Sequence, residues 1–331
     1  MTSLGSWLAI SMWAVSLHTQ AQEPPDFTQF ATGDGAYYTT IGGQVVDPYF
    51  VNKGFIIALQ ANAPLQTEFV RWIDWLLPKQ RKDGGFDRFC PTADKTWRQC
   101  MPADADDSMA ASTIEMLHTA MKKNWVPAPQ QNAAKKAVLN SHQLLARLRN
   151  PKTQLYKAFA DVELYYLMDN IEVYEALRAV GGRATEMRAN QLAAAIRQQF
   201  WDGTQWKPAF PEYDRPQFYP HTLASAYLWQ TGVIPAAESD SATAAWLAQN
   251  AGTWLSRQAD HYAWGLIAWK MHQTAPIQAA CWRASLRPFQ STIGWTVLDA
   301  MIDLSLEHQG IAKQCATGLA PAAAGEQRGA P

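Results

Sequence analysis

Residues that suit helix starts recur along this chain at nearly constant spacing, and this spacing most constrains the fold. Between residues 46 and 310 the apolar side chains follow a helical period, and the two-residue alternation of strands is almost absent. Several segments begin with an acid or a proline suited to a helix N-terminus, namely Asp47-Pro48, Asp104, Asp161, Pro220 and Asp260. The first four starts lie 57, 57 and 59 residues apart, which leaves room for two helices and their loops. The sequence therefore predicts a series of helical hairpins.

Proline and glycine breaks divide the chain into about eleven helix-length segments, with room for a twelfth. Return helices are expected over residues 66–79 and 130–148. We predict an all-α fold, an (α/α)6 toroid, which is a barrel of about six helical hairpins. In such a barrel the N-termini of the inner helices gather at one end, together with free backbone N–H groups. An irregular helical solenoid has the same local signals and is the competing architecture.

The composition excludes several classes of function. With 28 basic and 29 acidic residues, the net charge of −1 argues against a surface that binds polyanions through counterion release. No glycine-rich phosphate loop and no metal-ligand spacing occurs, so we expect no nucleotide, metal or other cofactor. The 15 tryptophans are unusually many, and most lie within expected helices, where they are interpreted as packing. Those expected near the barrel mouth are Trp97, Trp201, Trp206, Trp264 and Trp295.

The first 21 residues resemble a signal peptide. Residues 6–17 are apolar but too few to span a bilayer, and Thr19 and Ala21 suit a signal-peptidase site. Residues 1–5 carry no Lys or Arg, so a buried N-terminal helix or a start assigned too far downstream stays open. We expect one domain over residues 22–316, a disordered Ala/Gly/Pro-rich tail over 317–331, and no membrane span after the signal is removed.

Four cysteines fit an exported protein. They allow three pairings, of which we favour Cys90 with Cys100, closing one loop, and Cys281 with Cys315, tying back the C-terminal segment. Metal binding is disfavoured because the chain has no CxxC and no HxxxH. The sequence therefore predicts two disulfides in a periplasmic or secreted protein.

Two acidic segments are candidates for chemistry. Three carboxylates, Asp104, Asp106 and Asp107, crowd one predicted helix start, and crowded acids have split pKa values that suit acid/base work. The plainer interpretation is an acidic first turn that complements the helix dipole. The second segment, residues 161–172, is expected to open another helix and includes Asp161, Glu163 and Asp169. It predicts a polar floor beneath a cleft, a solvated stripe, or a polar network that links inner and outer helices.

Aromatic residues are frequent in the loops before the expected inner helices. Aromatic faces bind the apolar C–H faces of sugar rings, while carboxylates and amides bind the hydroxyls. Each aromatic side chain could instead close the barrel end as core, and a lone histidine is more often structural. The candidate substrate-binding residues are Trp97, Trp206, Tyr219, His221, His261 and Trp264.

These residues resemble the six-hairpin glycosidase superfamily, and are most similar to family 8 glycoside hydrolases, which include bacterial periplasmic cellulases. The family's Ala-Asp-Ala-Asp-like segment, which opens an inner helix at the substrate cleft, matches Ala103 to Asp106, and the helix order matches over about residues 35–310. The resemblance implies a polysaccharide hydrolase. The family's proton donor is a Glu in a Glu-Gly-x-x-Tyr-like segment, and the corresponding residues here, 51–55, contain none. Hydrolysis by another acid, β-elimination, or glycan binding without catalysis therefore all remain open.

A second resemblance, to class II terpene cyclases, rests on Gly84-Gly85-Phe86 and the Asp104 to Ser108 segment. It implies that Asp106 protonates an alkene or epoxide. An exported chain with many polar aromatic loop residues suits a prenyl substrate poorly. We therefore predict a monomeric glycoside hydrolase acting on a polysaccharide by carboxylate acid/base chemistry. A non-catalytic glycan-binding protein of an exopolysaccharide system is the alternative, and a terpene cyclase the second alternative.

Overall fold

The structure is a computed structural model that describes residues 27–94, 96–211, 217–257, 262–286, 288–292 and 294–315. Ten α-helices lie in the described part of the chain. Their bounds are α1 Pro48–Ala61, α2 Gln66–Leu76, α3 Asp106–Lys122, α4 Gln131–Leu148, α5 Leu167–Val180, α6 Arg183–Phe200, α7 Ala236–Leu255, α8 Gly265–Met271, α9 Pro276–Ser285 and α10 Val297–His308. The expected all-α toroid is confirmed.

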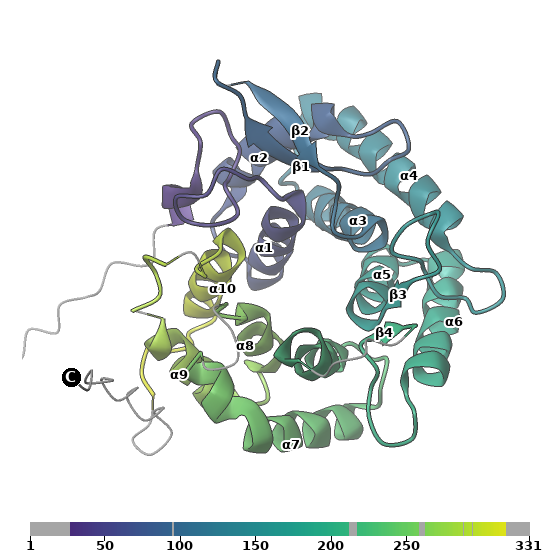
Figure 1. The fold of residues 1–331 in the computed structure, drawn as a ribbon. Coiled ribbons are helices and arrows are strands. Elements are labelled where there is room, and N and C mark those ends of the chain that lie inside the picture. Colours follow the sequence, from purple (N-terminus) through teal and green to yellow (C-terminus); the bar gives the residue numbers. More distant parts are fainter. Residues whose placement is uncertain are drawn as a thin grey trace, which may run out of the picture.

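The helices form two concentric rings (Figure 1). Around the inner ring, α1 contacts α3, α3 contacts α5, and α10 contacts both α8 and α1. Between α5 and α8, a short π-helical turn (Phe218–Thr222) and a 3-10 helix (Ser225–Leu228) take the fourth inner position, and the 3-10 helix contacts both neighbours. The outer ring consists of α2, α4, α6, α7 and α9 (Figure 1). The inner ring therefore closes on itself.

Burial distinguishes inner from outer helices. Inner α1 begins with Pro48 behind the N-cap Asp47, whose Oδ1 accepts the Tyr49 N–H at 3.1 Å, and ends at Asn62 in the left-handed conformation. It is buried on nearly all sides, as expected for a helix surrounded by others. Outer α2 buries one stripe, made by Phe69, Trp72, Ile73 and Leu76, at the spacing of an amphipathic helix.

Two small antiparallel sheets sit in the loops. Strands β1 (Arg88–Pro91) and β2 (Trp97–Met101) form a hairpin, and β3 (Tyr165–Tyr166) pairs with β4 (Ala209–Phe210). The hairpin is closed by a disulfide between Cys90 and Cys100, and a second disulfide joins Cys281 to Cys315. Both predicted pairings are confirmed.

Three of the expected helix starts are wrong. Helix α3 begins at Asp106 with Ala105 as its N-cap, so Asp104 precedes the helix instead of capping it. Helix α5 begins at Leu167 and not at Asp161, because the chain before it is held extended by the pairing of Val162 with Phe159 and of β3 with β4. Pro220 starts no α-helix, since it lies in the π-helical turn.

Several expectations concern residues that the structure does not describe. These are the signal segment 1–21, the tail 317–331, and Asp260 and His261. No described helix is long and apolar enough to cross a membrane. The packing role of the tryptophans is confirmed for Trp72, Trp229, Trp254 and Trp282, which are fully buried. Trp295 belongs with them, although it was expected at the mouth.

Candidate active site

A cavity of about 940 Å³ lies at the end of the barrel where the inner helices begin. Its lining includes residues from the first turn, or just before it, of α1, α3, α5, α8 and α10. The N-termini of the inner helices therefore gather at one end, and the chain segments that precede them form the walls. This volume lies in the range of small-molecule sites, roughly 300–1,000 Å³.

One wall of the cavity is aromatic. The rings of Tyr219 and Trp264 stack with centroids 5.2 Å apart and planes 14° apart, and Tyr262 packs against Trp264 at 5.5 Å. Trp264 stands at the start of α8 with a φ of 50°, followed by Gly265. A Cβ at Gly265 would lie 2.7 Å from the ring of Trp282, so only glycine lets the chain turn into α8 here.

Carboxylates occupy the other walls. Among the described lining residues the charged groups are Asp47, Arg88, Asp104, Asp169 and Asp299. Arg88 bridges two of them, with its Nε 2.7 Å from Asp47 and an Nη 3.2 Å from Asp104. The Asp104 side chain remains 78% exposed, so its carboxylate is open to water. Asp299 accepts the Gly265 N–H at 2.7 Å and the Thr296 hydroxyl at 2.6 Å.

Two carboxyl groups, those of Asp107 and Asp169, pair at the cavity floor. Asp169 lines the cavity and Asp107 lies behind it, fully buried, with a hydrogen bond between the two side chains. One oxygen of each has no other hydrogen-bond partner in the described structure. Burial raises the pKa of both groups well above the usual range, and the neighbouring carboxylate charge raises it further. This pair is therefore suited to retain a proton near neutral pH.

A buried ion pair supports the floor from below. The Tyr49 hydroxyl donates to Glu172 at 2.6 Å, and the same carboxylate lies 3.1 Å from the ammonium group of Lys53. Tyr227 hydrogen-bonds to Tyr49, and burial raises the pKa of both phenols, so both stay protonated. Both tyrosines line the cavity.

The structure brings together three of the six carboxylates predicted for catalysis. Asp104 and Asp169 line the cavity, and Asp107 lies behind Asp169. Asp106 points elsewhere and pairs with Arg81 at 2.7 Å. The other two lie on the exposed loop before β3, where Glu163 pairs with Lys157 at 3.3 Å and Asp161 faces solvent.

The predicted aromatic and histidine residues divide in the same way. Tyr219 and Trp264 line the cavity. Trp97 instead packs against Trp75 and donates to Asp34, and Trp206 packs against Trp201. His221 lies outside the lining and accepts the Gln217 N–H at 3.2 Å, and His261 lies outside the described residues.

Tyr49, Arg88 and Asp299 also line the cavity, and none of them was predicted from the sequence. A carboxylate near the start of α10 was detectable, because Thr296 and Asp299 have the spacing of an N-cap and its third residue. Arg88 gave no signal, since the short hairpin that carries it has no helical pattern. No three His, Cys, Asp or Glu side chains of the described residues are grouped as metal ligands would be.

Several solved structures with a similar architecture are glycosidases. No protein-family model matches the chain, and no curated protein matches its sequence. A reducing-end-xylose releasing exo-oligoxylanase complexed with xylose superposes with a TM-score of 0.54 at 15% identity, covering 87% of this chain and 90% of that one. A mutant of Rex8A from Paenibacillus barcinonensis complexed with xylose gives 0.55 at 13% identity, covering 86% and 89%. A glycosidase variant in complex with glucose gives 0.55 at 12% identity, covering 86% and 94%.

The structural similarity extends over most of both chains. Because the sequence identity is low, this similarity establishes the architecture and nothing more. Three features of this chain agree with that architecture: the closed ring of inner helices, the outer return helices and the cavity at the N-termini of the inner helices. The chain therefore has the six-hairpin glycosidase fold.

Proposed function

We propose that the protein is a glycoside hydrolase-like enzyme that acts on an oligosaccharide or polysaccharide in the large cavity. The observation that carries the proposal is the meeting of two kinds of group in one cavity. The Tyr219–Trp264 stack offers a flat apolar surface for a sugar ring, and Asp104, Asp169 and Asp299 face the same space. Glycoside hydrolysis needs this combination, because two carboxyl groups must flank a bound glycosidic bond.

Asp169 and Asp104 suit the two chemical roles. Asp169 shares a proton with Asp107 in a buried environment, and it would donate that proton to the leaving glycosidic oxygen as the C–O bond breaks. Asp104, open to water, would accept a proton from the water that attacks the anomeric carbon. Asp107 is then a positioning residue, because it touches Asp169 and not the cavity.

Other features bear on the substrate, the localisation and the oligomeric state of the proposed enzyme. The proteins of similar fold were solved with xylose and glucose, so xylo- and gluco-oligosaccharides are the first substrates to test. The two disulfides and the N-terminal apolar segment support a periplasmic or secreted protein. The closed inner ring supports a single domain over residues 22–316. We also propose that the protein is a monomer, which light scattering would test.

The test is the release of reducing ends from xylo-oligosaccharides and β-glucans by the purified protein. Asp169→Asn and Asp104→Asn are each expected to lower kcat by at least about 100-fold, because each removes one acid/base group. Asp161→Asn is the matched control, since Asp161 is exposed on a loop away from the cavity. If both cavity variants retain wild-type turnover, the acid/base assignment is wrong.

Glycan binding without catalysis is the second candidate, and one observation favours it. At the first inner helix, where the family 8 pattern has a glutamate, the buried side chain is Lys53, and it pairs with Glu172. Saturable oligosaccharide binding by calorimetry, with neither reducing ends nor unsaturated products released, would replace the hydrolase proposal with this one. A terpene cyclase function has no such support, because Asp106 pairs with Arg81 and does not line the cavity.

A further inference from the structure

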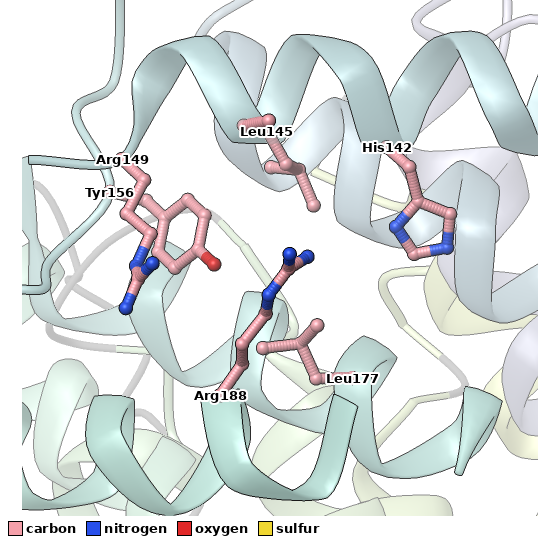
Figure 2. Close-up of a pocket in the computed structure, with 7 residues that line it drawn as sticks. His142, Leu145, Arg149, Tyr156, Leu177 and Arg188 are labelled. Carbon is pink, nitrogen blue, oxygen red and sulfur yellow. The ribbon is translucent and has the colours of Figure 1, made fainter. Parts of the chain in front are cut away.

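A second cavity lies in the outer wall of the barrel, beside α4, α5 and α6 (Figure 2). It shares no lining residue with the large cavity. Its volume of about 70 Å³ has room for roughly five water-sized groups. A small oxyanion such as phosphate has that many non-hydrogen atoms.

The polar groups around this cavity are cationic or neutral. They are His142 on α4, Arg149 directly after it, Tyr156 in the following loop and Arg188 on α6. The remaining lining residues, Leu145, Ala146 and Leu177, are apolar. No carboxylate therefore lines the cavity among the residues that the structure describes.

Two of these polar groups have no protein partner. Figure 2 shows the guanidinium group of Arg188 between Leu145 and Leu177, with the Tyr156 hydroxyl pointing toward it. Tyr156 is only 3% exposed, whereas Arg188 is exposed to solvent, and neither the Tyr156 hydroxyl nor the Arg188 guanidinium forms a hydrogen bond or ion pair with the described parts of the chain. The hydroxyl opens onto the cavity, where a ligand or water can hydrogen-bond to it. Arg149, in contrast, donates to the side chains of Gln154 and Gln191.

The local charge also favours an anion. Burial lowers the pKa of His142, and the positive charge of Arg188 lowers it further. The electrostatic potential at His142 is therefore made more positive by Arg188. Burial raises the pKa of Tyr156, and the positive charges of Arg149 and Arg188 both lower it in part. Two guanidinium groups beside one small, partly open pocket attract an oxyanion, which accepts their hydrogen bonds in a forked geometry.

We propose that this cavity, defined by His142, Arg149, Tyr156 and Arg188, binds a small oxyanion. Arg188 and Tyr156 donate to its oxygens, and Arg149 adds positive charge. Because Arg188 belongs to α6 and His142 to α4, the bound anion would join two neighbouring outer helices. The oxyanion could come from inorganic phosphate or from the carboxylate of an acidic sugar, and the experiment separates these two sources.

The experiment is thermal unfolding of the full-length protein with sodium phosphate or sodium glucuronate, against sodium chloride at equal ionic strength and constant pH. We expect a saturable rise in Tm of about 2 °C at ten times the Kd for at least one oxyanion. Phosphate alone would identify a tetrahedral anion site, and glucuronate alone a carboxylate site. In the same titration the ring resonances of His142 should shift with the same Kd.

Arg188→Gln should weaken binding about tenfold or more, and Tyr156→Phe should weaken it while retaining the ring. Arg183→Gln is the matched control, because Arg183 lies on the exposed first turn of the same helix and does not line the cavity. The proposal is overturned if both oxyanions act only as chloride does. It is also overturned if Arg188→Gln, folded with the wild-type circular dichroism spectrum, binds as tightly as the Arg183→Gln control.

Discussion

At the scale of single residues, the surroundings of the Asp107–Asp169 carboxyl pair at the floor of the large cavity determine its protonation. Neither Oδ2 has a partner in the described structure beyond the contact between the two side chains. Burial disfavours the charged forms, so the pair retains a proton that two exposed aspartates would have lost. This proton also affects stability, because the folded chain binds it more tightly than the unfolded chain does.

Asp107→Asn should therefore make stability less dependent on pH. The pKa of Asp107 is higher in the folded chain than the value of about 3.9 in the unfolded chain, so wild type loses stability as pH rises through the folded-state pKa. The variant lacks this titration, and its urea midpoint should fall less than that of wild type between pH 4 and pH 8. Asp161→Asn, on the exposed loop, should follow the wild-type curve. Parallel curves for wild type and Asp107→Asn would contradict the raised pKa.

Trp264→Ala should weaken oligosaccharide binding. The variant removes half of the stacked pair at the cavity wall, and an aromatic contact of this kind contributes roughly 0.5–1.5 kcal/mol, which corresponds to an increase in Kd of about 2- to 12-fold. Trp206→Ala is the control, because Trp206 forms a similar pair with Trp201 away from the cavity. Calorimetric titration with a xylo- or gluco-oligosaccharide measures both. An equal loss in the two variants would show that the cavity stack has no special role in binding.

At the scale of elements, short loops fix how an outer helix meets its neighbour. The turn between α2 and β1 packs against α4, where the Gly84 carbonyl accepts the Ser141 hydroxyl at 3.1 Å and the Gln80 amide at 3.0 Å. Gly84 has a φ of +98°, and a Cβ there would lie 2.2 Å from the carbonyl oxygen of Asn140. Both the backbone conformation and the space therefore require glycine at this position.

Gly84→Ala should destabilise the fold more than a glycine substitution at a similar φ in open space. Gly203 provides the control, with a φ of +103° and no atom within 4 Å of the added Cβ. Gly203→Ala should cost about 1 kcal/mol from backbone strain alone, and Gly84→Ala at least about 2 kcal/mol more, because α4 must move. Urea unfolding of the two variants checks this. Equal losses would mean that the close packing of the turn against α4 contributes nothing.

At the scale of the whole molecule, the barrel is closed by contacts between its first and last inner helices. Helix α10 packs against α1, and the Gln309 amide after α10 donates to the Ala61 carbonyl at the end of α1 at 2.8 Å. The disulfide between Cys281 and Cys315 then ties the segment after α10 to the outer helix α9. This link spans 34 residues, whereas the disulfide between Cys90 and Cys100 spans ten.

Removal of the C-terminal disulfide should therefore cost more stability than removal of the hairpin disulfide. Loop-closure entropy gives about 4 kcal/mol for a loop of 34 residues and about 3 kcal/mol for one of ten. Thermal unfolding of the Cys281→Ser/Cys315→Ser and Cys90→Ser/Cys100→Ser double variants measures the two losses. A larger loss for the hairpin pair would contradict the entropic order and indicate that local packing of the hairpin dominates.

The regular spacing of helix starts predicted the class of fold, because helical periodicity and helix-start residues are local signals. The same signals failed at Asp161, where the pairing of β3 with β4 keeps the chain extended up to Leu167. They also failed at Pro220, since only contacts with the neighbouring inner helices show that short turns can fill the fourth position of the ring. Residues that pair across long sequence separations leave no local trace.

The sequence by itself determined an all-α barrel of hairpins, two disulfides and an acidic cluster at the start of α3. Only the tertiary structure decided which acids lie close together. Asp106 and Asp107 are adjacent in the chain, yet Asp106 points outward and pairs with Arg81, whereas Asp107 points inward and contacts Asp169 on α5. Successive residues of a helix point about 100° apart, so the surrounding ring selects which of them faces the cavity floor. Asp299 reaches the same cavity from the far end of the chain because α10 lies next to α1 once the ring has closed.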